Sequence, residues 1–278
     1  GIRDTSVTGV QTCALPISPA PAPPAPATSA AGSVAAARAA DHPAVVETRL
    51  LGRSSEGRPI RAYRLGEPAR AGLPTVVLIA VMHGDERAPR RILTTLVDGE
   101  PIIGADLWIV PTYNPDGAAA NRRTSATGVD LNRNYPYRWA DLDGHYESGP
   151  RPASEPETRA MMGFLADVDP DYVLSFHQPL RGVDTQTKSP AFSKRVARAL
   201  HLPRSSFTCG STCHGTMTMW FNHRFDGVAL TVEYGAHPTA RTLTRQAPAA
   251  LLRLFGAQHG SYDIGPVPDD PATPSPRG

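Results

Sequence analysis

The sequence predicts an α/β fold built on a sheet with parallel strands. Two observations carry this prediction. Runs of β-branched and aliphatic residues alternate along the chain with segments of helical apolar spacing, an order typical of strand–helix–strand units. The apolar runs are continuous and do not alternate with polar residues, which indicates strands that are covered on both faces.

A strand and a helix come first in the predicted order of elements. Residues 74–86 are a strand that runs into a polar turn, and residues 87–99 are a helix with Ile92, Leu93 and Leu96 on one face and a glycine stop. A second helix is predicted at residues 156–170, where a Pro stands near the start and an acid lies in the first turn. The later elements are strands at residues 105–117, 172–179 and 227–235 and helices at 156–170 and 189–203.

Composition bounds the domain organisation and the partners. A net charge of +2 over 278 residues predicts no nucleic-acid partner, and no apolar run approaches the roughly 18 residues of a membrane helix. Residues 18–31 and 265–278 each contain five prolines and little apolar surface. We therefore expect a disordered Ala/Pro-rich linker at 18–40, a catalytic domain at 41–263 and a disordered tail at 264–278.

The first 17 residues are interpreted as an artefact. Reverse translation of residues 7–17 can give the sequence of a common short-read sequencing adaptor, so the authentic N-terminus and any signal peptide are expected to be missing. Cys13 then drops out of the cysteine count. Cys209 and Cys213 can close a small disulfide, which indicates a secreted or cell-envelope protein; a pair of free thiols is the alternative.

Three polar side chains at predicted strand ends have the chemistry of a metal site. His83 and Glu86 follow the first strand three residues apart, and His177 lies at the end of the third. The carboxyl ends of parallel strands are where α/β sheets bind ligands. Two imidazoles and one carboxylate can hold a catalytic zinc ion and leave a fourth position open. Alone, such a pattern more often reflects a structural histidine.

Five motifs in a fixed order change that balance. "HGDE" (83–86), "NPDG" (114–117), "GVDLNRNYP" (128–136), "SFHQP" (175–179) and "TVEYG" (231–235) together resemble the zinc carboxypeptidases, and most of all their compact bacterial branch that includes murein peptide amidases. The resemblance covers about residues 45–258. It implies a three-layer α/β/α fold with a central mixed, mostly parallel, twisted sheet.

The resemblance also implies a role for individual residues. His83, Glu86 and His177 look like the ligands of one zinc ion per chain. Glu233 looks like the general base that takes a proton from water, and Arg122 looks like the arginine that polarises the scissile carbonyl.

Further positions are assigned from the same motifs. Asn132 and Arg133 match the pair that grips the free carboxylate of a substrate. Arg123 is the neighbour with which Arg122 is most easily confused, and its simpler interpretation is a solvated charge. Asp116 and Asp130 are read as turn residues or as carboxylates that orient a metal-binding histidine.

Two features of the sequence bear on the substrate. Digestive relatives carry a mobile tyrosine about twenty residues before the catalytic glutamate, whereas here Phe221 is nearest to that position. A pocket for a diamino acid needs an acid and a base, and Asp184 with Arg181 is a candidate pair.

The expected activity is hydrolysis of an amide bond next to a free carboxylate by a secreted zinc metallopeptidase that acts as a monomer. The favoured substrate is the γ-D-glutamyl-diamino acid bond of peptidoglycan stem peptides. Two alternatives stay open: a general carboxypeptidase that removes L-amino acids from peptides, and an inactive module that binds peptides or cell wall.

Overall fold

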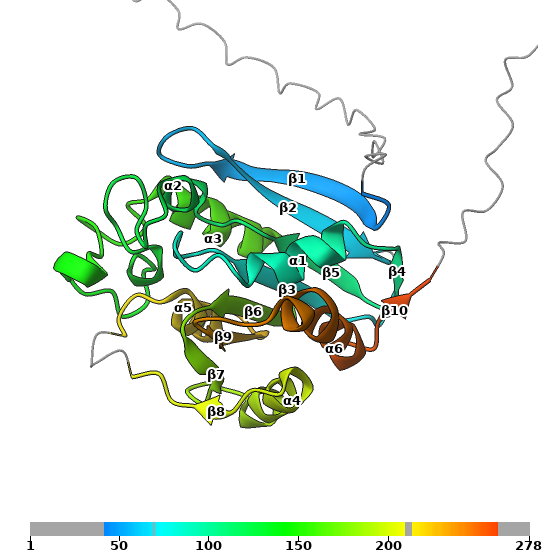
Figure 1. Ribbon diagram of the computed structural model, residues 1–278. Coiled ribbons are helices and arrows are strands. Elements are labelled where there is room, and N and C mark those ends of the chain that lie inside the picture. The colour runs from blue at the N-terminus through cyan, green and yellow to red at the C-terminus, as the bar shows by residue number, and fades with distance from the viewer. Residues whose placement is uncertain (1–41, 69, 209–212, 261–278) are drawn as a thin grey trace, which may run out of the picture. The chain divides into compact units, whose positions relative to one another are not determined.

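The computed structural model describes residues 42–68, 70–208 and 213–260, which form a mixed sheet between two layers of helices (Figure 1). Eight strands follow the order β1-β2-β5-β3-β6-β9-β7-β8. The central strands β5, β3, β6 and β9 are parallel, whereas β1, β2 and β7 join antiparallel. The predicted three-layer α/β/α fold is confirmed. The segments at 1–17, 18–40 and 264–278 lie outside the described residues, so their boundaries stay predictions.

The strands of this sheet come from the whole length of the described chain. The predicted central strands correspond to β3 (Thr75–Ala80), β5 (Asp106–Val110), β6 (Tyr172–His177) and β9 (Val228–Gly235). The others are β1 (Val45–Arg53), β2 (Pro59–Gly66), β7 (Leu180–Asp184) and β8 (Arg204–Ser205). A separate two-stranded sheet pairs β4 (Ile102–Ile103) with β10 (Gln258–His259).

Helices cover both faces because the central strands are apolar on both sides. In β3, Leu78 packs into one core and Val77 into the other. The first core lies under α1 (Arg90–Val97), α4 (Pro190–Leu200) and α6 (Ala247–Leu254), and α6 follows a π-helical turn, η4 (Thr242–Gln246). The second lies under α3 (Pro156–Val168) and α5 (Met217–Arg224). Short helices are α2 (Pro115–Ala120), η1 (Leu131–Arg133) and η2 (Gly144–Tyr146).

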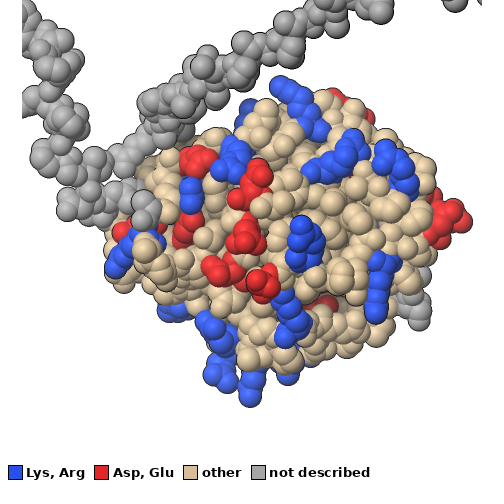
Figure 2. Space-filling model, turned by 180° about the vertical axis from the view of Figure 1, so that it is seen from behind, with Lys and Arg blue, Asp and Glu red and all other residues tan. Residues whose placement is uncertain are grey.

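The surface charges and the helix lengths bear on the expectations from composition. The face opposite to the view of Figure 1 shows acidic and basic side chains intermixed (Figure 2). None of the helices in the described part of the chain is long and apolar enough to cross a bilayer.

The β1–β2 hairpin is fixed by a buried carboxylate from α2. Asp116 accepts hydrogen bonds from the Ser54 hydroxyl at 2.7 Å, from the Glu56 backbone N–H at 2.9 Å and from the Arg58 guanidinium at 2.7 Å. Its side chain is almost completely buried. Asp116 therefore has a structural role: it holds the turn of this hairpin, and its hydrogen bonds do not go to a metal-binding histidine.

Candidate active site and metal centre

The polar residues of interest meet at the carboxyl ends of β3, β6 and β9. A cavity of about 670 Å³ opens there, and its walls include His83, Glu86, His177 and Glu233. The turn after β3 is shaped by Val81, whose φ of 56° is unusual for a β-branched residue. At Gly84 the backbone lies against Gly117, where an added Cβ would stand 1.9 Å from a carbonyl carbon. Only glycine permits this approach, which brings the "HGDE" turn against α2.

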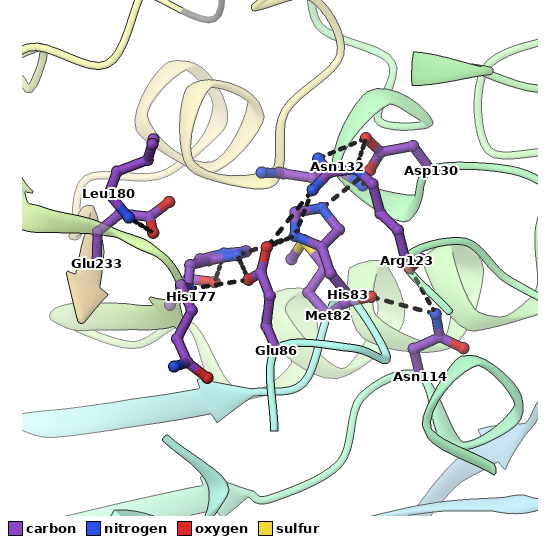
Figure 3. Close-up of polar contacts among 12 residues, drawn as sticks. Met82, His83, Glu86, Asn114, Arg123, Asp130, Asn132, His177, Leu180 and Glu233 are labelled. Atoms are coloured by element: carbon purple, nitrogen blue, oxygen red, sulfur yellow. Dashed lines mark hydrogen bonds and ion pairs between the residues drawn. The ribbon is translucent and has the colours of Figure 1, made fainter. Parts of the chain in front are cut away.

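Three side chains converge at the floor of this cavity (Figure 3). Nδ1 of His83 lies 2.7 Å from Glu86 Oε1, Nδ1 of His177 lies 2.9 Å from Glu86 Oε2, and the two Nδ1 atoms are 3.3 Å apart. All three residues are buried, and their ligand atoms fit within 4.8 Å of one another. Within the described ranges this is the group of His, Cys, Asp and Glu side chains that can hold a metal ion.

The opposite ring nitrogens are occupied by other protein groups. His83 Nε2 lies 3.1 Å from Asp130 Oδ1, and His177 Nε2 lies 2.8 Å from the Ser175 hydroxyl. Ser175 and His177 are two residues apart in β6, so their side chains share one face of the strand. Such outer contacts fix the ring orientation of metal-binding histidines. They leave both Nδ1 atoms and the Glu86 carboxylate for a metal, which is the donor set that zinc prefers.

Electrostatics favour a cation at this point. Burial opposes the charged form of His83, but the carboxylates of Glu86 and Asp130 outweigh it and raise the pKa of His83 to about 9. Burial alone would also raise the pKa of Glu86, yet the two histidines hold it below its ordinary value. The cluster therefore stabilises an ionised carboxylate together with positive charge, and a bound metal ion would supply that charge in place of the proton on His83.

Arg123, and not Arg122, faces the metal donors. Its guanidinium donates to Asp130 Oδ2 at 2.8 and 3.0 Å, and Nη1 lies 3.2 Å from His83 Nδ1. Arg123 lines the cavity, whereas Arg122 is not among the residues that do. The side-chain amide of buried Asn114 donates to two backbone carbonyls, that of Arg123 at 3.4 Å and that of Met82 at 3.2 Å (Figure 3). Asn114 thereby links the Arg123 segment to the end of β3. The expected position of Arg122 is thus taken by its neighbour.

Asn132 and Arg133 line the same cavity from η1. The Asn132 side chain accepts a hydrogen bond from the backbone N–H of Met217 at 3.0 Å, which fixes its orientation. Arg133 is 3% exposed, its Nε has no hydrogen-bond partner among the described residues, and burial lowers its pKa. A guanidinium that lines a cavity and is otherwise buried is suited to binding a carboxylate.

Tyr146 is a residue of the cavity that the sequence did not point to. Its ring lies 4.7 Å from the guanidinium carbon of Arg133 and 5.6 Å from that of Arg123. Both distances fit cation–π contacts, which hold the two guanidinium groups on one side of the cavity. Tyr146 is the last residue of the short helix η2, and the sequence there shows no periodicity or local motif, so only the folded structure reveals its place.

Glu233 lies on β9, opposite His177 in the parallel pairing of β6 and β9. Its Oε2 accepts a hydrogen bond from the Leu180 backbone N–H at 3.2 Å (Figure 3). The residue is 8% exposed, and burial is the main cause that raises its pKa above the ordinary value. A carboxylate with a raised pKa beside a metal site is suited to accept and return a proton.

Two expectations for the substrate pocket are corrected. Phe221 does not reach the cavity, because it is fully buried in the second core and stacks on Phe225 at 4.7 Å. Thr218 and Met219 of α5 line the cavity in its place. Asp184 lines the cavity, and burial raises its pKa, but Arg181 lies on another cavity. The two therefore do not form a pair.

A His/Glu/His donor set with a buried carboxylate and an arginine beside it, at the strand ends of an α/β sheet, is the arrangement typical of a metallohydrolase. Residues 33–180 match the peptidase M14 family, described as zinc carboxypeptidase. Murein peptide amidase A of Escherichia coli K12 is 32% identical over 171 residues, which cover 56% of this chain and 69% of that protein. Carboxypeptidase D of Drosophila melanogaster is 30% identical over 165 residues, which cover 49% of this chain and 12% of that protein.

Solved structures agree with the sequence matches. The murein-tripeptide amidase of Escherichia coli O157 superposes with a TM-score of 0.62 at 26% identity. The superposition covers 77% of this chain and 93% of the amidase chain. Carboxypeptidase A of Helicoverpa armigera shares the fold, with a TM-score of 0.61 at 19% identity, covering 77% of this chain and 68% of that chain. The chain belongs to the zinc carboxypeptidase family, in its bacterial branch similar to murein amidases, and is a zinc metallopeptidase.

Replacement of Asp130 by asparagine should weaken zinc binding by about 10- to 100-fold, because an amide holds the His83 ring less firmly than a carboxylate. The affinity is measured by competition with a fluorescent chelator. Asp167→Asn, an exposed acid on α3, is the matched control and should bind zinc like the parent. Equal affinity in Asp130→Asn and the parent would contradict the orienting role of Asp130.

Proposed function

We propose that this metallopeptidase hydrolyses an amide bond next to a free carboxylate in peptidoglycan stem peptides, at the γ-D-glutamyl-diamino acid bond. The observation that carries the first part is Arg133, a buried guanidinium that lines the same cavity as His83 and Glu86. The similarity to a murein-tripeptide amidase supports the second part. We assign the zinc to His83, Glu86 and His177.

The roles of the chain's own residues follow from where they stand. Bound zinc supplies a Lewis acid that makes water a stronger acid and polarises a carbonyl group. Glu233 lies in the same cavity, so we assign to it the removal of a proton from water and its transfer to the leaving amine. Arg123 is assigned to the developing negative charge on the carbonyl oxygen, in place of Arg122.

The free carboxylate of the substrate is assigned to Arg133 and Asn132. Both residues line the cavity. The Tyr146 ring packs against the Arg133 guanidinium, and Asp130 accepts a hydrogen bond from the neighbouring Arg123. A carboxylate bound there would direct the neighbouring amide bond toward the metal donors. The scissile bond would then lie one residue from the carboxyl end of the substrate.

The side chain of the released residue meets a polar pocket. Threonines and one acid line this part of the cavity: Asp184, Thr216, Thr218 and Thr231. A carboxylate favours a substrate side chain that ends in an ammonium group, as in a diamino acid. Arg181 does not supply the matching cation, so the specificity for a diamino acid depends on Asp184 in this proposal.

Export of the enzyme belongs to the same proposal. It rests on the cell-wall substrate and on the predicted Cys209–Cys213 disulfide, of which Cys209 lies outside the described residues. A monomer with one zinc ion per chain is likewise our expectation.

The zinc-loaded protein should release diaminopimelate from a stem tripeptide that ends in meso-diaminopimelate and should leave a mixture of ordinary peptides uncut. Products are identified by mass spectrometry. Glu233→Gln should lower the rate by about 10²–10⁴-fold, because the proton acceptor is removed. Its zinc content should stay at the parental level, which separates the loss of the base from loss of the metal.

Other products would redirect the proposal. Trimming of ordinary L-amino acids would make the enzyme a general metallocarboxypeptidase, and a preference for terminal lysine would locate the selectivity at Asp184. Absence of all cleavage with zinc bound and peptide retained would favour the inactive binding module.

A second prediction separates the two adjacent arginines. Arg123→Gln should lower kcat/KM by about 10²–10³-fold, the usual effect of losing one oxyanion donor. Arg122→Gln should stay within about threefold of the parent, because Arg122 is not among the residues that line the cavity. The opposite order of the two variants would return the role to Arg122.

A further inference from the structure

The helices that cover the first core carry charges of one sign only. α6 packs against both α1 and α4, and η4 packs against α1, so these helices form one layer (Figure 1). They contain no Asp or Glu, although the whole chain has nearly as many acids, 26, as Lys and Arg residues, 28. With Arg241 at the start of η4, the layer carries eight cations, which we call the basic face: Arg90, Arg91, Lys194, Arg195, Arg198, Arg241, Arg245 and Arg253.

The cations of the basic face are open to solvent and are not neutralised. All eight side chains are exposed, and none forms an ion pair within residues 42–68, 70–208 and 213–260. Arg195 donates to the backbone carbonyl of Leu254 at 3.3 Å, which leaves its charge uncompensated. Asp98, the acid that directly follows α1, lies 2.8 Å from His42 Nδ1. The positive charge of this face is therefore available to a partner.

Three of these cations surround one depression. A cavity of about 370 Å³ between α4 and the η4–α6 segment is lined by Arg241, Arg245 and Arg253, and no acid lines it. A concave surface that carries one sign of charge concentrates ions of the opposite sign. The face opposite to the view of Figure 1 mixes both signs (Figure 2), so the excess of positive charge is local.

The chemistry of the basic face favours a broad anionic surface as the partner. Its cations are spread over neighbouring helices and do not follow a single groove. Phe192, the aromatic residue of these helices, is buried, so no ring is offered for the base stacking that binds single-stranded nucleic acids. The large apolar side chains that are exposed in the described residues, Leu50 and Leu180, lie in β1 and β7. Binding would therefore be electrostatic, without insertion of apolar groups.

We propose that the basic face docks the enzyme onto the anionic phosphate headgroups of a phospholipid bilayer. Each Lys or Arg beside such a surface adds to the attraction, and the sum over eight residues is large although the net charge of the chain is only +2. None of the eight residues lines the active-site cavity, so the proposal does not depend on the proposed substrate.

The test is sedimentation of the zinc-loaded full chain with vesicles. Vesicles of phosphatidylglycerol and phosphatidylcholine in equal parts should bind the protein at low ionic strength, and vesicles of phosphatidylcholine alone should not. Added sodium chloride should release the protein, because the salt screens exposed charges. Combined Arg241→Gln, Arg245→Gln and Arg253→Gln should weaken vesicle binding by about 100-fold.

A control with the same loss of charge makes the result specific. Combined Arg138→Gln, Arg151→Gln and Arg224→Gln removes three exposed arginines outside the basic face and should stay within about threefold of the parent. Thermal unfolding checks that the variants are folded. Arg90→Gln with Arg91→Gln tests the other end of the face and should weaken binding by about 30-fold, whether or not the triple variant folds.

Several results would overturn the proposal. These are equal binding to both kinds of vesicle, binding to neither, an equal loss in the control variant, or parental affinity in Arg90→Gln with Arg91→Gln. Tighter binding to a DNA duplex than to the phosphatidylglycerol vesicles would also overturn it, because the partner would then be a nucleic acid.

Discussion

The convergence of His83, Glu86 and His177 is the constraint on which the rest of the site depends. Three buried polar groups within hydrogen-bond distance of one another are stable only if their charges and donors are matched. Asp130 and Ser175 match the outer nitrogens, Nε2 of His83 and Nε2 of His177. The Nδ1 atoms of the two histidines and the Glu86 carboxylate face a single point, where a divalent cation would match them.

The parallel strands explain how this convergence is achieved. β3 and β6 are neighbours, and their carboxyl ends deliver His83 and His177 to the same edge of the sheet. β9 follows on the other side of β6 and brings Glu233 into register with His177. The α2 turn and η1 are then drawn over this edge by Asn114 and Asp130, which hold Arg123 beside the metal donors.

Continuous apolar runs made the central strands and the larger helices predictable from the sequence. The other strands were not predicted, because β1 is mostly partly exposed without a regular alternation, and β7 and β8 are too short to show a period. The metal donors were also within reach, since each follows a buried strand, and the structure brings them together.

Three details depended on backbone direction and were beyond the sequence. Arg122 and Arg123 are adjacent and chemically identical, so only the path of the turn decides which of them faces the cavity. Arg181 and Asp184 are three residues apart in β7 but line different cavities, and the φ of 56° at Arg181 is a backbone feature that the sequence does not indicate. Phe221 was placed by counting from Glu233, whereas the helical geometry of α5 turns it into the core.

The most direct test of the metal centre is an anomalous difference map from crystals of the zinc-loaded protein, recorded at the zinc absorption edge. We expect one peak per chain at about 2.0–2.2 Å from Nδ1 of His83, Nδ1 of His177 and a carboxylate oxygen of Glu86. The Nε2 atoms should keep their contacts with Asp130 and Ser175. A peak coordinated by the Nε2 atoms, or by other residues, would contradict this account of the site.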